Sequence, residues 1–600
     1  MPSFVTKKGT VLSVTAYTGD AKTLLAFNLA KKSAKNLAGF TIECKPGDQP
    51  SYYLHNTLQF KTPGNHAQDP SEPANSSINA PLHKFRWLHV PGSVHQGVRP
   101  FLGRYKYTVT PRYFDGQRAL QPLDPSLGVS VSTDVVPFKK KGLELGFTRG
   151  FTQSQAFVNH FGLKARIRPN DDLLFDTSEV SGKDAAGNEY TYADEYEWLG
   201  FTARERIFAV LEEVASEKSL RVDVFAYDLN EPDLVTLLVK LAKQKKLRII
   251  LDDAALHHSK KDPKPEDEVE TLIDKARKNV IKRGHFGRYA HDKVFIVSND
   301  DGPQKVLTGS TNYSVTGLYV NSNHILVFND PVVAAKYAEV FDNAWDNDVK
   351  KPAFVSSTLS SETFTFTSKQ TPRTDITFAP HAEKFATEIL DSLVARIDEE
   401  GKTKGGSVLF AVMAIDSGSG PVYDALKSIH KDEEVFSYGI SDEPGGIALY
   451  KPGARTGVLV TGKPAKTQLP PPFNQVRNLG LGHQIHHKFV VCGFNGDDPV
   501  VYCGSSNLAL GGETANGDNL LAIHDSDVAT VFMIEALALV DHFHFLNKVA
   551  TEGDSSAAKT PSKPQAALSA GWFLGTTDKW TEPYFDTDDV HSVDRALFGM

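Results

Sequence analysis

After about residue 195 the sequence runs twice through the same order of helices and strands, and this repeat limits the folds that the chain can adopt. Amphipathic helices alternate with short apolar strands, a pattern typical of βαβ units around a sheet covered on both faces. In the first copy we expect these elements in turn at 203–217, 220–227, 232–244, 247–251, 293–297, 305–308, 324–328 and 331–345. In the second copy we expect them at 382–397, 408–415, 421–429, 434–438, 488–492, 500–502, 520–524 and 529–546. The repeat predicts a duplicated α/β core.

The N-terminal part of the chain carries a different pattern. Short strands rich in aromatic and β-branched residues are separated by Gly, Pro, Asn and Asp, and the clearest are Thr10–Tyr17, Gly39–Cys44, Phe85–Val90 and Tyr105–Tyr113. This pattern predicts an all-β sandwich. It ends near the Lys-Lys-Lys-Gly run at 139–142, or at the Gly-Phe-Thr-Arg-Gly-Phe stretch just after that run.

These patterns divide the chain into five parts. The Ser/Thr-rich segment 356–371 is expected to join the two halves, and Ser555–Lys559 to begin a linker. Aromatic residues beyond that linker, which are Trp572, Trp580, Tyr584 and Phe585, suggest that the end of the chain packs back onto a domain. We therefore predict a β-sandwich domain (1–145), a first half (146–352), a linker (353–375), a second half (376–552) and a C-terminal tail (553–600).

Composition narrows the class of protein. With 40% hydrophobic residues, 23% charged residues and a net charge of −8, the chain resembles an ordinary soluble protein and not one that coats nucleic acid over its whole surface. No apolar run approaches the roughly 18 residues of a membrane span, and the N-terminus lacks the apolar region of a signal peptide. We therefore expect a cytoplasmic protein. Its three cysteines form no CxxC pair, so we expect buried thiols and no zinc site.

Two short motifs recur at the same place in both copies. A His-x-Lys triplet starts a strand rich in Val and Phe, and a Gly-Ser-x-Asn motif comes after it, with 21 residues from His to Asn in each copy. A single His-x-Lys has no predictive value, but two copies at one spacing within a duplicated fold are a specific signal. The matched positions are His291, Lys293, Ser310 and Asn312 in the first copy and His486, Lys488, Ser505 and Asn507 in the second.

These residue types suit the cleavage of a phosphodiester. A neutral imidazole can attack phosphorus, while a second, protonated imidazole can give the leaving oxygen its proton. Charge that develops on the other phosphoryl oxygens requires fixed positive charge and hydrogen-bond donors, which the two lysines, two asparagines and two serines can supply. The scheme needs no metal and no cofactor.

On these motifs the chain resembles the phospholipase D superfamily, whose pattern is H-x-K-x4-D and then G-S-x-N. The resemblance spans roughly residues 150–550 and implies a phosphodiesterase that works through a covalent phosphohistidine. Ser298 and Gly493 stand where the pattern has its aspartates. Tyrosyl-DNA phosphodiesterases, a branch of the superfamily, also lack them, so the departure counts more against a standard phospholipase than against catalysis.

The resemblance also implies a partner for each histidine. Superfamily members carry a carboxylate 13 residues after the motif serine, and here that position is Asp518 in the second copy but Asn323 in the first. Pairing within each copy predicts that His486, beside Asp518, is protonated more easily and acts as the acid. His291, beside Asn323, then attacks, as the N-terminal histidine often does in the family. A carboxylate also strengthens its imidazole as a nucleophile, so the opposite assignment stays open.

A basic segment leads to the first histidine. Residues 275–293 hold seven Lys and Arg residues against one acid, with aromatic residues between them. We expect Arg283, Arg288 and Tyr289 to contact the substrate in a groove that follows phosphates, although a solvated helix face explains such a run equally well. The charge favours nucleic acid, and phospholipid headgroups are the alternative.

Two further interpretations stay open. The chain can be a non-catalytic module that binds a phosphorylated ligand, and the N-terminal sandwich can bind a protein partner.

Asp252 and Asp253 with His257 and His258 suggest a metal site. We instead expect the aspartates to end a strand and cap the segment after it, and the histidines to be solvated in a Lys-rich loop.

Overall fold

The structure is a computed structural model that describes residues 4–150, 155–162, 165–170, 172–184, 186–413, 420–444, 457–463, 485–554 and 573–599. Ser555–Lys559, expected to begin the C-terminal linker, and Trp572, expected to pack back, lie outside the described residues. No helix in the described ranges combines the length and the apolar character that crossing a bilayer requires.

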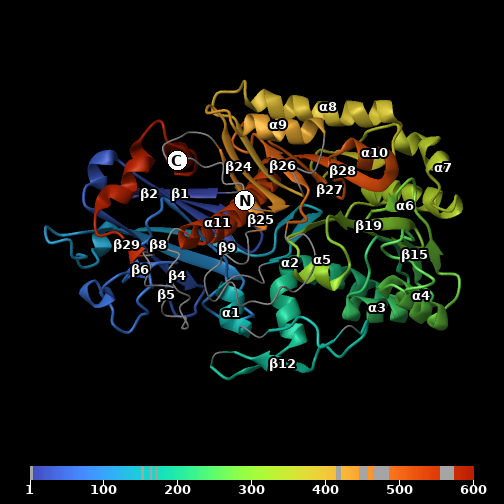
Figure 1. Cartoon of the computed structure of the whole chain (residues 1–600), viewed down its shortest axis with the longest axis horizontal. Helices are drawn as coiled ribbons and strands as arrows, with labels where there is room; N and C mark the ends of the chain where they lie inside the picture. The colour runs from blue at the N-terminus through green and yellow to red at the C-terminus, as the bar shows by residue number, and fades with distance from the viewer. Residues whose placement is uncertain are drawn as a thin grey trace.

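The N-terminal region is built from two four-stranded sheets (Figure 1). One sheet has the order β1 (Phe4–Lys8), β2 (Leu12–Thr18), β3 (Thr23–Leu29) and β7 (Arg86–His89). The other has the order β5 (Tyr52–Tyr53), β4 (Leu37–Pro46), β8 (Gly103–Tyr113) and β9 (Val129–Val135). Apolar side chains from both sheets share one core, among them Val14, Phe27, Ile42 and Tyr107. The strand-rich sequence pattern of this region therefore corresponds to β-strands in the structure.

The next region forms a mixed α/β sheet of eight strands. Its order is β10 (Lys139–Lys140), β11 (Leu143–Phe147), β20 (His324–Phe328), β19 (Gly302–Gly309), β18 (Val294–Asn299), β14 (Arg221–Ala226), β15 (Leu247–Leu251) and β16 (Ile281–Arg283). Alternate side chains of a strand face opposite sides. Val222 and Val224 accordingly pack under α2 (Tyr192–Ser216) and α3 (Pro232–Lys243), and Phe225 packs under α6 (Pro331–Asp346). The Lys run at 139–142 thus enters the sheet as its edge strand.

A second sheet has the same strand order. It runs β21 (Phe364–Phe366), β22 (Thr374–Ala379), β28 (Asn516–His524), β27 (Val500–Gly504), β26 (Phe489–Cys492), β23 (Ser407–Val412), β24 (Phe436–Pro444) and β25 (Val458–Lys463). Helices α8 (Glu383–Glu400) and α9 (Pro421–Ile429) share a core with its outer face. The residues expected to link the halves, 353–375, contain β21 and the start of β22.

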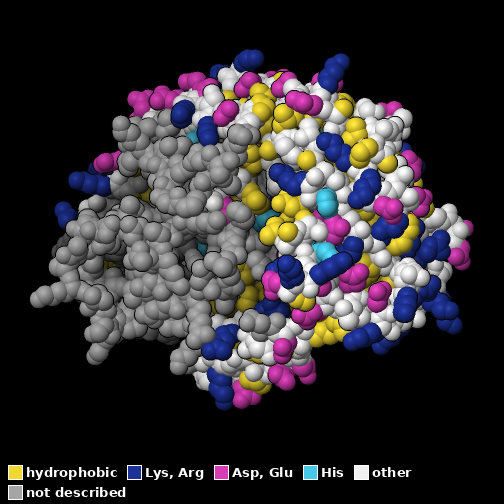
Figure 2. All heavy atoms as spheres, turned by 45° about the vertical axis from the view of Figure 1, so that its right-hand side comes forward, with side chains coloured by type: hydrophobic (Ala, Val, Ile, Leu, Met, Phe, Trp, Pro, Cys, Tyr) yellow, Lys and Arg dark blue, Asp and Glu magenta, His cyan; other side chains and the backbone are white. Residues whose placement is uncertain are grey.

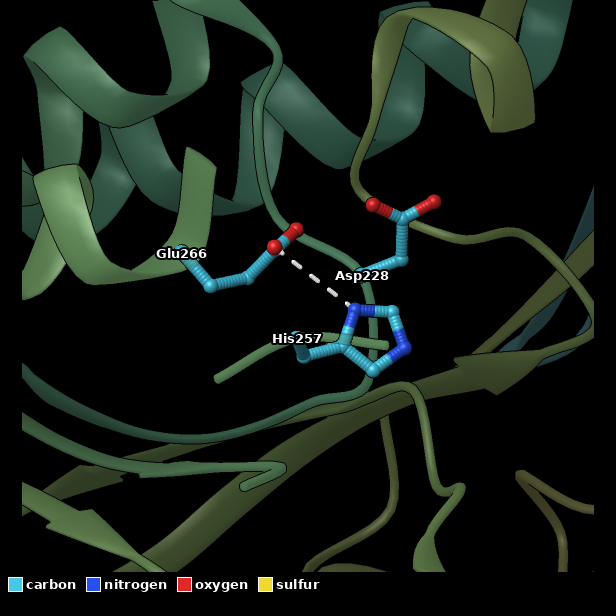
Figure 3. A group of neighbouring side chains, drawn as sticks. All are labelled: Asp228, His257 and Glu266. Carbon is cyan, nitrogen blue, oxygen red and sulfur yellow. Dashed lines mark ion pairs between the residues drawn. The ribbon is translucent and has the colours of Figure 1, made fainter. Parts of the chain in front are cut away.

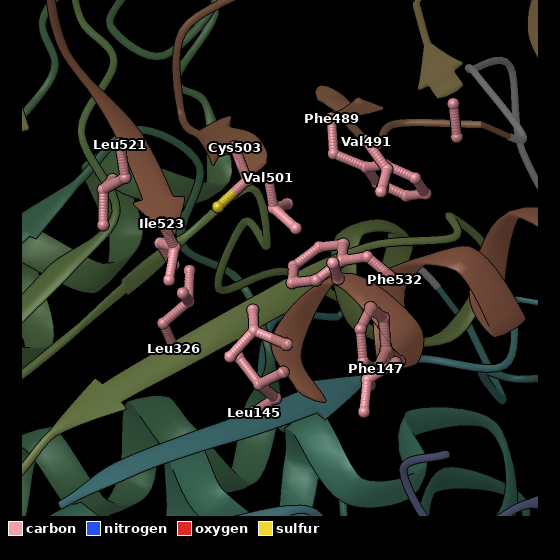
Figure 4. Close-up of a cluster of buried hydrophobic side chains, with 14 of the residues drawn as sticks. Leu145, Phe147, Leu326, Phe489, Val491, Val501, Cys503, Leu521, Ile523 and Phe532 are labelled. Carbon is pink, nitrogen blue, oxygen red and sulfur yellow. The ribbon is translucent and has the colours of Figure 1, made fainter. Parts of the chain in front are cut away.

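The inner faces of the two sheets meet in one hydrophobic core (Figure 4). Helix α11 (Ser526–Asp554) lies between the sheets, and its Phe532 ring packs edge-on against Phe147 of the first sheet and Phe489 of the second. Burying such an aromatic side chain stabilises the fold by about 1.5–3 kcal/mol. A short strand, β17 (Tyr289–Ala290), leaves the first half and pairs with β28 of the second.

The end of the chain contacts the N-terminal sheets and the second half. Strand β29 (Phe573–Leu574) pairs with β6 (Gln59–Phe60). Trp580, Tyr584 and Phe585 surround Phe85, and α12 (Val590–Phe598) places Phe598 against Tyr17 and Phe436. The three cysteines are free and buried, which confirms that they are buried thiols.

Candidate active site

Both His-x-Lys motifs lie in the contact between the two halves. His291 and Lys293 connect β17 to β18, and His486 and Lys488 precede β26. Because alternate residues of an extended chain face the same side, the His and Lys of each motif point one way and the residue between them points the other. The imidazoles retain 6% and 8% exposure, and the lysines are fully buried.

The histidines are paired across the halves, not within them. The Nδ1 atom of His291 lies 2.6 Å from Oδ1 of Asp518, and Nδ1 of His486 lies 2.9 Å from Oδ1 of Asn323. The predicted pairing of His486 with Asp518 and of His291 with Asn323 is therefore wrong. The reason is that β17 pairs with β28, Tyr289 opposite Asn516 and Ala290 opposite Gly517, so the next residues, His291 and Asp518, come together. A parallel bridge between Ser322 and Ile485 brings Asn323 and His486 together in the same way.

Each partner is itself held in place. The Nδ2 group of Asn323 donates to the Gly317 carbonyl at 2.8 Å, which turns its Oδ1 towards His486, and the Ser310 hydroxyl donates to the same oxygen at 2.8 Å. Asp518 accepts a hydrogen bond from Asn516 Nδ2 at 3.1 Å, and a further bond from Ser505 lowers its pKa. Burial is the largest influence, and it raises the pKa of Asp518 to about 6.

Hydrogen bonds at Nδ1 orient both imidazoles. The Asn323 side chain and the Ser310 carbonyl, 3.1 Å from Nδ1 of His486, present acceptor oxygens to that atom, and Nζ of Lys488 lies 3.2 Å from it. His291 donates from Nδ1 to Asp518. Nε2 is then the nitrogen through which each ring can act as a base, an acid or a nucleophile.

Burial shifts the pKa values of the basic side chains in the site. It lowers the pKa of His291 well below its ordinary value, and the charges of Lys293, Lys488 and Arg288 lower it further. Burial also lowers the pKa of Lys293 to about 8, and that of Lys488 well below its usual range. Each lysine donates to the carbonyl of the histidine two residues before it. The uncharged form of the His291 ring is therefore favoured.

The motif asparagines lie beyond the ends of β19 and β27. The Oδ1 atoms of Asn312 and Asn507 are both buried and have no hydrogen-bond partner. A buried amide oxygen without a partner costs about 1–3 kcal/mol. The corresponding asparagines of the two halves therefore share a buried Oδ1 atom without a protein partner.

The middle residues of the two triplets join the halves on the opposite side of the motifs. Asp292 accepts from Asn519 Nδ2 at 2.8 Å, and the ring of His487 stacks on that of His324 with centroids 5.4 Å apart. Sequence reasoning overlooked these contacts. The alternation of His-x-Lys gives the direction of the middle residue, but no local pattern identifies its partner.

Tyr227 is a further residue that the sequence did not indicate. Its ring meets that of His291 edge-on with centroids 4.7 Å apart, and the Lys293 ammonium lies 4.8 Å from the ring centre. The aromatic face therefore holds both members of the first motif in position.

The predicted substrate contacts differ in their surroundings. Arg288 is exposed, with its Nε 2.9 Å from Asn516 Oδ1 and its guanidinium over the Tyr289 ring. Arg283 is 12% exposed and pairs with Asp267 and Glu270. On the described part of the face in Figure 2, cationic and acidic side chains are mixed. The structure thus leaves Arg288 and Tyr289 next to the motif, while Arg283 neutralises carboxylates.

Fold and site together define a protein whose one paired-histidine centre is assembled from two α/β halves. Residues 211–345 match the family described as "Cardiolipin synthase, PLD-like domain". This match identifies a phospholipase D-like domain within the first of the two halves. A search of the curated proteins found no match.

Solved structures with a similar arrangement are distant in sequence. Polyphosphate kinase from Porphyromonas gingivalis is 13% identical over 62% of this chain and 52% of its own, with a TM-score of 0.38, so this chain spans about half of that protein. Nuc, a phospholipase D family member from Salmonella typhimurium, is 23% identical over 24% of this chain and 86% of its own (TM-score 0.20). Yeast tyrosyl-DNA phosphodiesterase is 10% identical over 53% and 85% (TM-score 0.27). These low scores leave the family match as the ground for the assignment.

Proposed function

We propose that the protein is a metal-independent phosphodiesterase with a duplicated phospholipase D-like core and an N-terminal β-sandwich. The observation that carries the proposal is the pair of crossed histidine contacts, which brings His291 and His486 of the two halves into one buried centre. The family match over residues 211–345 supports it.

The crossed contacts support one histidine as the nucleophile and the other as the acid. The argument differs from the one based on pairing within each copy. When Nε2 of His291 attacks phosphorus, the ring becomes positively charged, and the Asp518 carboxylate at Nδ1 stabilises that charge. His486, beside the neutral Asn323, lacks such support and gives up its proton more readily. The nucleophile is therefore His291 and the acid is His486.

The reaction proceeds in two balanced steps. In the first step a bond forms between His291 Nε2 and phosphorus, the bond from phosphorus to the leaving oxygen breaks, and that oxygen takes the proton from His486 Nε2. In the second step water attacks phosphorus, His486 takes a proton from that water, and the bond to His291 breaks. Lys293 and Lys488, with Asn312 and Asn507, stabilise charge on the remaining phosphoryl oxygens.

Nucleic acid is the substrate class that we favour, because Arg288 and Tyr289 combine an exposed cation with an aromatic ring beside the first motif. The test is to incubate the wild-type protein with labelled single-stranded DNA, RNA and phosphatidylcholine, with and without excess EDTA. We expect the protein to turn over a nucleic acid. EDTA should leave the rate of turnover unchanged at a temperature where the protein stays folded. Turnover of phosphatidylcholine alone would assign the lipid alternative. Absence of any turnover would favour a binding module, and loss of turnover in EDTA without unfolding would contradict the metal-free mechanism.

Replacing Asp518 by Asn tests the charge that the mechanism places behind His291. The amide oxygen still accepts the Nδ1 hydrogen, so the ring keeps its orientation but loses the countercharge. We expect turnover to fall about 10–100-fold, as for other residues that support a catalytic histidine or ligand from behind. Single-turnover kinetics should locate the loss in formation of the covalent intermediate. Asp292→Asn, which removes a nearby buried carboxylate that contacts Asn519 instead of a histidine, is the matched control and should have a smaller effect.

A further inference from the structure

A second cluster of ionisable side chains lies behind Tyr227. Asp228 comes just after β14, His257 lies in the turn after β15, and Glu266 is in the first turn of α4 (Pro265–Ala276). One possible ligand atom from each residue lies within 4.8 Å of the other two, and Nδ1 of His257 is 3.6 Å from Oε2 of Glu266. Figure 3 shows the polar ends of the three side chains gathered in one place, although they come from three segments.

The cluster has more negative charge than its surroundings neutralise. Glu266 is 2% exposed and His257 is 8% exposed. Among the described residues, no Lys or Arg forms an ion pair with the carboxylate of Asp228 or of Glu266. The Nε2 atom of His257 is buried without a hydrogen-bond partner. Two neighbouring carboxylates in such a place require either a shared proton or a cation.

We propose that Asp228, His257 and Glu266 bind one divalent transition-metal cation. One imidazole nitrogen with two carboxylate oxygens is a donor set that suits Zn²⁺ and Mn²⁺, whereas Mg²⁺ prefers oxygen ligands alone. Asp228 is partly exposed, so a cation can reach the cluster from solvent and water can complete its coordination.

The other candidate ligands suggested by the sequence are used elsewhere. Asp252 accepts hydrogen bonds from the backbone of Ala254 and Ala290, Asp253 pairs with His285, and His258 pairs with Asp267. His257 is buried, so the expectation that both histidines are solvated is wrong for this one. Its neighbours are Asp228 and Glu266, which lie in other segments of the chain.

The cation site is distinct from the phosphodiester site. Tyr227 lies next to both, since its ring contacts that of His257 with centroids 4.3 Å apart and that of His291 with centroids 4.7 Å apart. A cation bound at the cluster joins the end of β14 to α4 and to the turn after β15. These segments lie next to Tyr227, whose ring supports the first motif. Its expected effect is on stability and not on the chemical step, so it does not depend on the proposed function.

The test uses the full chain after treatment with chelator and desalting. We expect Zn²⁺ and Mn²⁺ each to bind with one equivalent per chain by calorimetry and elemental analysis, and to raise Tm, while Mg²⁺ at the same concentration does not. Glu266→Gln and Asp228→Asn should each weaken binding at least tenfold and remove the rise in Tm. Both changes keep the backbone and side-chain hydrogen bonds made through Oε1 and Oδ1, so the cation-free variants should unfold near the wild-type temperature.

Two controls separate this cluster from other histidine and carboxylate sites. Asp253→Asn removes the neighbouring pair with His285, and His291→Ala removes the proposed nucleophile; both variants should bind the cation as the wild type does. The proposal would be overturned by absence of binding to the wild type, by binding unchanged in both Glu266→Gln and Asp228→Asn, or by binding lost in His291→Ala. Each of these outcomes can occur whether or not the protein cleaves phosphodiesters.

Discussion

Replacing His291 by Ala is expected to lower phosphodiester turnover by at least about 10⁴-fold, because it removes the nucleophile on which both steps depend. The variant should also fail to form the covalent intermediate. The measurement is single-turnover kinetics with a ³²P-labelled substrate that is quenched in base, since an N-phosphorylated histidine resists base and decays in acid.

His486→Ala should behave differently, because it removes the acid but leaves the nucleophile. Turnover of an ordinary substrate should fall about 10²–10⁴-fold. A substrate whose leaving group needs no proton, such as a p-nitrophenyl ester, should still label His291, and the label should accumulate because the base for the second step is missing. His524→Ala, at the far end of β28 in a partly exposed pair with Asp498, is the control and should remain fully active. Labelling of the His291→Ala variant would place the nucleophile elsewhere.

Replacing Lys22 by Met is expected to lower the free energy of unfolding by about 3–5 kcal/mol, because it leaves a buried carboxylate without its partner. Lys22, before β3 of the N-terminal sheet, forms an ion pair with Glu535 of α11, and both side chains are less than a tenth exposed. Urea unfolding of the full chain measures the loss. Adding Glu535→Gln to the variant should recover most of it, and Lys336→Met, which breaks a more exposed pair, should change stability by less than about 0.5 kcal/mol.

The same pair predicts the direction of a pH dependence. Burial raises the pKa of Glu535, but the charge of Lys22 and the contact with His487 together more than offset this and bring it to about 2. A carboxyl group whose pKa is lower in the folded state stabilises the protein above its unfolded pKa, here about 4.5, and loses that contribution as the pH falls towards 2. The wild-type protein should therefore lose stability between these values, and the Lys22→Met, Glu535→Gln double variant should lack this component. An identical profile for both proteins would contradict the role of the pair.

Single elements show where sequence patterns were sufficient. The strands at 247–251 and 324–328 and the helix at 421–429 have the predicted bounds, because their apolar periodicity reports directly on burial. Helix α2 begins at Tyr192 instead of at 203, and its kink at Phe201, where φ is 46°, explains why the pattern indicated only the later part. Strand β21 was missed because Phe364 and Phe366 alternate within a Ser/Thr-rich segment that we interpreted as a linker.

The sequence alone was enough to propose the motif residues and to predict which of them share a face of a strand. Spacing and alternation along a strand are local properties, so His291, Lys293, His486 and Lys488 could be placed on shared faces without knowledge of the fold. Only the tertiary structure decided how those faces meet. It brought His291 to Asp518 through the pairing of β17 with β28, and His486 to Asn323 through the bridge between Ile485 and Ser322. It also placed Arg283 in ion pairs and brought Asp228, His257 and Glu266 together. These are contacts between separate segments of the chain, and their geometry depends on how whole sheets and helices pack, which no local pattern records.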